Sequence, residues 1–256
     1  MIKFSVCIEA LYGKIPTYVE RIEKVAGVGM KAFEFWGFGN KDIDAIKSAK
    51  DKYGLEVAMF GADVGGPLVD PANRKKIADG LKRSAEVAHK LDCKSLIVTT
   101  GNEIPGVSRD EQHKSIVDGL KIAAKVMEDE GITLCLEPLN ILVNHKGYYL
   151  YTSSEAFQII DEVGSPNVKI LYDIYHQQIT EGNLIATITA NIDKIGHFHL
   201  ADVPGRHEPG TGEINYRNVF KSIAQTGYNK FVGLEYWPIG SDDDSLKMLL
   251  DMTKDL

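Results

Sequence analysis

Cysteine is scarce in this sequence, and its three cysteines form no CxxC pair. Cys7, Cys93 and Cys135 all lie in or beside apolar, strand-like segments, where a thiol is usually a buried and reduced small side chain. An odd number of such cysteines gives no basis for a disulfide framework. We therefore expect a protein of a reducing compartment, the cytoplasm.

Long apolar runs and an excess of positive charge are also missing. No stretch approaches the roughly 20 apolar residues that span a bilayer. The N-terminus shows no basic segment followed by an apolar one, so we expect no export signal. The formal net charge is −7, which disfavours nucleic acid and anionic membranes as partners.

What the sequence does contain is a regular alternation of two kinds of segment. Short apolar runs alternate with longer segments of helical periodicity, and no linker or low-complexity tract interrupts them, so we expect one domain over residues 1–256. The expected strands are KFSVCIE (3–9), KAFEFW (31–36), LEVAMFGA (55–62), KSLIVTT (94–100), ITLCLEPL (132–139), VKILYDIY (168–175), KIGHFHLAD (194–202) and KFVGLEYW (230–237).

Helix-start signals agree with this alternation. Ser108 with Glu111, and Thr152 with Glu155, have the spacing of capping boxes, and Pro16 suits a first helical turn. Eight consecutive strand–helix units predict an α/β protein with a single (β/α)8 TIM barrel. A doubly wound open sheet is the alternative, which we consider weaker because eight equivalent units close more naturally than they stack.

Polar side chains end the last four expected strands, at the edge of the barrel where such enzymes carry their chemistry. The four are Glu137, Asp173, His199 and Glu235, each about one strand–helix unit from the next. Alternation along each strand directs all four inward; in KFVGLEYW, for example, Gly233 shares the inward face with Glu235. The alternative is that each residue simply ends its strand in solvent.

Three inward carboxylates repel one another strongly in a narrow, low-dielectric mouth unless a cation neutralises them. Oxygen-rich ligation with one imidazole suits one divalent ion, with Mn²⁺ favoured and Mg²⁺ or Co²⁺ possible. A substrate that chelates such an ion has an acidified C–H, and Glu137 and Glu235 could remove and return its proton. This pattern predicts an isomerase or epimerase. No nucleotide fingerprint occurs in a suitable context, so no organic cofactor is expected.

Four segments carry a resemblance to a known family. LEPLN, YDIYH, FHLADVPGRHEPGTGEINY and GLEYWP resemble the hydroxypyruvate isomerase branch of the xylose isomerase-like TIM barrels, a superfamily that includes ketose 3-epimerases. The resemblance covers nearly the whole chain and implies a homodimer or homotetramer. It implies metal ligation by Glu137, Asp173, His199 and Glu235, acid–base roles for Glu137 and Glu235, and contacts of His176 and Arg206 with substrate oxygens.

Simpler structural roles remain open for several residues near these positions. Arg206 could brace its loop through an ion pair, and His176 could cap the sixth strand–helix junction. We interpret His197 as a hydrogen-bonded core histidine, and His207 and Glu208 as residues that hold the loop. Two strand-end residues could line the pocket, namely Glu9 and Trp36.

The chain departs from the pattern of both branches. Hydroxypyruvate isomerases often carry Arg and Lys where this chain has Leu142 and Trp237, and Gln where it has His199; ketose 3-epimerases carry Glu at Val143. Arg206 remains to pair with an acidic substrate. The substrate is therefore either a short keto acid of the hydroxypyruvate type or, as the alternative, a neutral ketose epimerised at C3.

Two further function classes are weaker. A metal-dependent phosphodiesterase of the endonuclease IV type shares the barrel but needs several zinc ions and a basic surface, whereas this chain has seven histidines and a net charge of −7. A non-catalytic sugar-binding barrel has no use for Glu137 and Glu235. We therefore expect an enzyme whose partner is a small sugar or keto acid.

Overall fold

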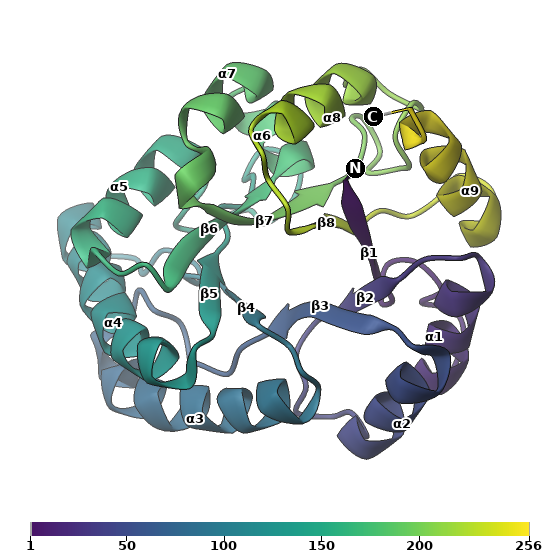
Figure 1. The fold of residues 1–256 in the computed structure, drawn as a ribbon. Helices are drawn as coiled ribbons and strands as arrows, with labels where there is room; N and C mark the ends of the chain where they lie inside the picture. Colours follow the sequence, from purple (N-terminus) through teal and green to yellow (C-terminus); the bar gives the residue numbers. More distant parts are fainter. Residues whose placement is uncertain (1, 256) are drawn as a thin grey trace.

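The computed structural model describes residues 2–255, and its eight strands form one closed parallel barrel in sequence order. β1 pairs with β2 on one side and with β8 on the other, while the helices form an outer ring (Figure 1). The expected (β/α)8 barrel is confirmed, and the open sheet is wrong. The strands are β1 (Lys3–Cys7), β2 (Ala32–Phe35), β3 (Glu56–Gly61), β4 (Ser95–Val98), β5 (Thr133–Leu136), β6 (Val168–Asp173), β7 (Ile195–Leu200) and β8 (Phe231–Leu234).

One α-helix follows each strand, and β6 alone is followed by two, α6 and α7. The helices are α1 (Tyr18–Gly27), α2 (Ile43–Tyr53), α3 (Arg74–Lys90), α4 (Arg109–Glu130), α5 (Ser153–Val163), α6 (Ile174–Thr180), α7 (Leu184–Ala190), α8 (Tyr216–Gln225) and α9 (Asp242–Thr253). Across residues 2–255, none of them combines the length and the apolar character that a bilayer crossing requires.

The helix starts follow the expected signals in part. Ser108 and Glu111 form both halves of a capping box at α4. At α5 the Thr152 side chain accepts from the Glu155 N–H, but the Glu155 carboxylate turns away into an ion pair, so the second expected box is only half formed. Pro16 lies before α1, which starts after its cap, and not within its first turn.

The barrel interior holds a small apolar layer that is separate from the main core between strands and helices. Met59, Ile97, Cys135 and Leu171 form this layer, and all three cysteines are buried and unpaired. Cys135 precedes position 137, and Leu171 precedes position 173, by two residues on the same inward face. Glu137 and Asp173 therefore stand above this apolar layer, at the C-terminal mouth of the barrel.

Candidate metal centre and active site

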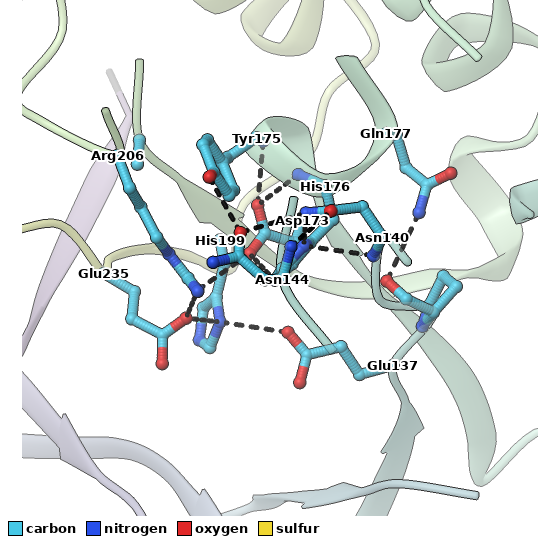
Figure 2. A network of polar contacts seen from close by, with 12 residues as sticks. Glu137, Asn140, Asn144, Asp173, Tyr175, His176, Gln177, His199, Arg206 and Glu235 are labelled. Atoms are coloured by element: carbon cyan, nitrogen blue, oxygen red, sulfur yellow. Dashed lines mark hydrogen bonds and ion pairs between the residues drawn. The ribbon is translucent and has the colours of Figure 1, made fainter. Parts of the chain in front are cut away.

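The four polar strand ends converge at the mouth of the barrel. Asp173 ends β6, His199 lies in β7, and Glu137 and Glu235 directly follow β5 and β8. All four are buried, and each offers one ligand atom within 4.8 Å of those of the other three. Figure 2 shows Glu137 and Glu235 on either side of the His199 ring. The alternative that each residue separately ends its strand in solvent is wrong.

The orientation of the His199 ring fits metal ligation. Its Nδ1 lies 3.5 Å from Glu137 Oε1 and 3.4 Å from Glu235 Oε2, yet it has no hydrogen-bond partner. A buried ring nitrogen without a partner requires an explanation. Three carboxylates and one imidazole around a common centre are a donor set that suits a hard or borderline divalent cation, so these residues fit one such ion.

The helix that follows β6 sets the orientation of Asp173. Its Oδ1 accepts hydrogen bonds from the backbone N–H of Tyr175 at 2.8 Å and of His176 at 3.2 Å, as the N-cap of α6. These bonds direct Oδ2 toward the cluster, where it lies 3.5 Å from Arg206 Nη2. One carboxylate oxygen therefore starts the helix, and the other remains available to a cation.

The two glutamates differ in their preferred protonation state. Burial raises the pKa of Glu137 to about 7. Burial also opposes ionisation of Glu235, but the charges of His199 and Arg206 outweigh it and hold the pKa of Glu235 well below its ordinary value. Near neutral pH, Glu235 is thus a carboxylate, while Glu137 is poised to hold or release a proton.

The loop after β7 presents Arg206 to the same site. Arg206 has a left-handed backbone, with φ of 60°, and its Nη2 lies 2.5 Å from Glu235 Oε2. The guanidinium lies 5.0 Å from the Tyr175 ring centre and 5.3 Å from that of Trp237, within the range of cation–π contact. The side chain therefore faces the cavity, and its ion pairs with Glu235 and Asp173 also link its loop to β6 and to the end of β8.

His176 also faces this site, and Asn140 determines its tautomer. The His176 Nδ1 accepts from the Asn140 backbone N–H at 3.2 Å and lies 2.6 Å from the Asn140 side-chain nitrogen, so the ring proton resides on Nε2. That atom lies 3.4 Å from Asp173 Oδ2 without a hydrogen-bond partner. Burial lowers the pKa of His176 to about 4, and a neutral ring with a free N–H donor results. The helix cap is Asp173, not His176.

A cavity of about 430 Å³ opens above these residues. Trp36, His145 and Trp237 line it together with both glutamates, and Trp36 Nε1 donates to Glu235 Oε1 at 2.7 Å. Glu9 does not line this cavity but accepts from the Trp36 backbone N–H. The strand-two tryptophan therefore both lines the cavity and orients Glu235.

Position 142 and its neighbour lie outside the cavity. Leu142 and Val143 are 71% and 68% exposed, and His145, with φ of 47°, is the member of this loop that reaches the cavity. Sequence reasoning missed His145, because periodicity carries no information about a left-handed turn in a loop.

Sequence reasoning also missed Glu34 in β2. Glu34 is 1% exposed inside the barrel, and its Oε1 lies 2.8 Å from His199 Nε2. Burial raises its pKa, but the charges of His199 and His197 lower it to about 2. A signal was present: in AFEF one carboxylate alternates with two phenylalanines, which places it on the inward face.

A buried carboxylate organises the loop that carries Arg206. Asp202 is fully buried and accepts four backbone hydrogen bonds from this loop, from Val203 at 2.9 Å, Gly210 at 2.8 Å, Gly212 at 3.0 Å and Ile214 at 3.0 Å. The expected loop-holding residues take part as well: His207 Nδ1 lies 2.6 Å from Trp237 O, and Glu208 accepts from Ile239 N–H at 3.0 Å.

Asp202→Ala is expected to reduce the free energy of unfolding by about 3 kcal/mol or more, because it leaves buried N–H donors without an acceptor. Urea denaturation measures this, with Asp193→Ala on the exposed turn before β7 as the matched control. A loss below about 1 kcal/mol, the size of one ordinary hydrogen bond, would show that the loop does not depend on Asp202.

Comparisons with known proteins agree with this architecture. Residues 22–256 match the family model described as "Xylose isomerase-like TIM barrel". The hydroxypyruvate isomerase of Escherichia coli is 35% identical, over 97% of this chain and 98% of that protein. The 2-oxo-tetronate isomerase of Pectobacterium atrosepticum is 30% identical, over 96% of each chain.

A solved structure extends the similarity to the whole fold. The protein from Brucella melitensis described as an AP endonuclease, family 2, superposes with a TM-score of 0.93 at 28% identity, over 98% of this chain and 99% of that one. Full-length similarity to two named isomerases, together with the closed barrel, leads to one conclusion: the chain belongs to the xylose isomerase-like TIM barrel family and is an isomerase.

Proposed function

We propose that the protein is a divalent-metal-dependent isomerase that interconverts hydroxypyruvate and tartronate semialdehyde through an enediol, with Glu137 and Glu235 as its acid–base pair. The observation that carries this proposal is the convergence of four ligand atoms within 4.8 Å at adjacent strand ends. The names of two full-length relatives, which specify hydroxypyruvate and 2-oxo-tetronate, support a short keto acid as substrate.

One divalent metal ion is part of the proposed active site. Glu137, Asp173, His199 and Glu235 would hold one divalent ion, Mn²⁺ in the first instance, with Mg²⁺ or Co²⁺ as alternatives. When bound, such an ion neutralises the carboxylates and stabilises negative charge that develops on a substrate carbonyl oxygen. No organic cofactor is part of the proposal.

The two glutamates would divide the proton transfer between them. Glu235, which is ionised near neutral pH, would accept the proton from the carbon next to the carbonyl group. Glu137, whose burial raises its pKa to about 7, would deliver a proton to the former carbonyl carbon, while the hydroxyl proton passes from the oxygen of the first carbon to the oxygen of the second. General acid–base catalysis of this kind contributes about 10²–10⁴-fold to the rate, and the opposite positions of the two carboxyls around His199 permit it (Figure 2).

Two further side chains would bind substrate oxygens. His176 offers its Nε2–H, because Asn140 occupies Nδ1. Arg206 offers a guanidinium between Tyr175 and Trp237, and this group is suited to a carboxylate. We propose that Arg206 recognises the acid group of the substrate, in place of the Arg and Lys that are absent from positions 142 and 237.

The alternatives are outcomes of the same experiments. A ketose 3-epimerase would act on a neutral sugar, which offers no carboxylate to the Arg206 guanidinium. A phosphodiesterase of the endonuclease IV type would need further metal ligands at the mouth of the barrel. Among residues 2–255, one other group has metal-ligand spacing, namely Glu34, His197 and His199; it lies lower in the barrel and shares His199 with the first group.

Assembly and location complete the proposal. By family resemblance we propose that the protein forms a homodimer or a homotetramer. We further propose that its partner is a small sugar or keto acid, and not a nucleic acid or a membrane. The buried, unpaired thiols support a cytoplasmic location. Light scattering of the purified protein tests the assembly.

Removal of metal is expected to lower the rate with hydroxypyruvate by about 10³-fold, since a Lewis acid supplies several kcal/mol of charge stabilisation. The enzyme is dialysed against a chelator and assayed in D₂O with and without Mn²⁺. Hydroxypyruvate and a neutral ketose are used as substrates in parallel assays. Restoration by Mn²⁺ and one solvent deuterium in the product are the expected results. Absence of isotope exchange with every short keto acid and ketose would refute the proposed chemistry.

A further inference from the structure

A second polar group lies below the metal-ligand cluster, inside the barrel. Glu34 Oε2 accepts a hydrogen bond from Ser5 Oγ at 2.7 Å and lies 3.0 Å from His197 Nε2. Its other oxygen, Oε1, lies 2.8 Å from Nε2 of His199. All four side chains are buried, so no bulk water competes for these contacts. Glu34 is thus the residue that connects the imidazole of the cluster to the interior of the barrel.

The neighbouring strand β8 leaves space for this contact. A Cβ atom at Gly233 in β8 would lie 2.3 Å from Glu34 Oε1 and 2.6 Å from His199 Cδ2, closer than real carbon atoms approach. Only glycine at this position therefore accommodates the carboxylate and the ring side by side. The Glu34–His199 contact depends on a specific residue of a third strand.

We propose that Glu34 is a positioning residue for His199, which keeps the ring proton on Nε2 and presents the Nδ1 lone pair to the metal. The inference rests on the proposed function, since it assigns a role to Glu34 through the proposed metal ligand. Its physical basis is that an ionised carboxylate only accepts hydrogen bonds, and that a carboxylate behind a ligating histidine determines its tautomer, its orientation and its basicity.

The Nε2–H bond of the His199 ring does not point at Glu34 Oε1. Although Nε2 and Oε1 are at hydrogen-bond distance, neither atom has a partner with hydrogen-bond directionality, so the N–H axis is turned away from Oε1. Alignment of this bond requires a rotation of the ring. Because Nδ1 is in the same ring, that rotation also re-aims Nδ1 relative to Glu137 and Glu235.

The same residues have the spacing of a second metal site. One atom each from Glu34, His197 and His199 lies within 4.8 Å of the others. The Glu34 oxygens, however, lie 3.0 Å from His197 Nε2 and 2.8 Å from His199 Nε2. These are distances of direct hydrogen-bond partners, with no room for an ion between the atoms. We therefore favour the positioning role, and metal stoichiometry distinguishes the two.

The test compares the Co²⁺ affinity of Glu34→Gln with that of the wild type. Calorimetry and the visible absorption of the bound ion measure this affinity. Gln offers one acceptor oxygen to three potential donors, so affinity is expected to fall about 10–100-fold, as for other residues behind metal ligands. Glu155→Gln, which removes an ion-pair partner on α5 outside the barrel, is the matched control with unchanged affinity. Imidazole ¹⁵N shifts of the metal-free protein, recorded at a pH where the His199 ring carries one proton, should show that proton on Nε2 in the wild type and divided between the two nitrogens in Glu34→Gln.

A double-mutant cycle with His199→Gln separates positioning from general damage. If Glu34 acts through the imidazole, Glu34→Gln has no further effect on Co²⁺ affinity once His199 is replaced. An equal effect in both backgrounds overturns the inference, and so does wild-type affinity in Glu34→Gln. Two bound Co²⁺ per wild-type chain, one of them lost in Glu34→Gln, would assign a second metal site instead.

Two controls keep the result interpretable. If Glu34→Gln does not fold, Ser5→Ala decides, since it removes one donor to Glu34 and should weaken Co²⁺ binding several-fold; unchanged affinity overturns the inference. A wild-type protein that binds no divalent ion overturns the proposed function and this inference together, whereas tight wild-type binding with no effect of either variant overturns the inference alone.

Discussion

Glu235→Gln is expected to lower kcat with hydroxypyruvate about 10³-fold while the protein keeps its metal ion. The amide retains an oxygen that can ligate, and it retains the shape that accepts the Trp36 N–H at 2.7 Å, but it cannot accept a proton. Loss of a general base costs about 10²–10⁴-fold. Because Glu235 is ionised near neutral pH, it would act as the base toward hydroxypyruvate.

Isotope exchange distinguishes the two glutamates from each other. Glu235→Gln should abolish exchange of the substrate C–H with D₂O together with turnover, because no proton is removed. Glu137→Gln should reduce turnover to a similar extent but retain exchange, since Glu235 still removes a proton and can return deuterium to the same carbon. NMR of the recovered substrate, with metal content measured on each variant, records both properties.

Two results would contradict this assignment. Wild-type kcat in either variant would exclude that residue as an acid or base. Retained exchange in Glu235→Gln with lost exchange in Glu137→Gln would reverse the two roles, and would mean that the bound ion changes the preference created by Arg206 and burial.

Arg206→Met is expected to reduce kcat/KM for hydroxypyruvate about 100-fold and to change that for a neutral ketose far less. One charge-assisted hydrogen bond contributes about 1.5–3 kcal/mol, and a bidentate carboxylate pair uses two such bonds. Methionine retains the apolar length that lies between Tyr175 and Trp237 but removes the charge. Steady-state kinetics with both substrates measures the difference.

The same variant separates substrate recognition from loop bracing. If Arg206 merely braced its loop, both substrates would suffer equally and the midpoint of urea unfolding would fall. Arg206→Lys provides a graded control, because lysine retains the charge but not the planar fork and should recover part of the lost rate. A larger loss for the neutral ketose than for hydroxypyruvate in Arg206→Met would favour the epimerase alternative.

Local patterns were sufficient to predict much of this site. The order of the eight strands follows from apolar runs at strand length alternating with helical periodicity, because each element must bury its own apolar face. The inward direction of Glu137 and Glu235 follows from alternation along β5 and β8, since successive side chains of a strand point to opposite faces. Both properties depend only on neighbours in the chain.

The residues that were missed depend on contacts between distant segments. Glu34 and His199 are 165 positions apart in number, and their contact requires the closure of the barrel and the open space at Gly233. His145 reaches the cavity through a left-handed turn. The partners of Arg206 come from α6 and from the segment after β8, which no local pattern relates to the loop after β7.

The chain order of residues thus determined which groups stand at the mouth of the barrel, because strand alternation and unit length are properties of short segments. Closure of the barrel decided which of these groups meet, and how the two glutamates differ. Burial opposes ionisation of both side chains, and the charges of His199 and Arg206 outweigh it at Glu235. Desolvation and Coulomb interaction depend on distances through space, and those distances exist only once all eight strands have assembled.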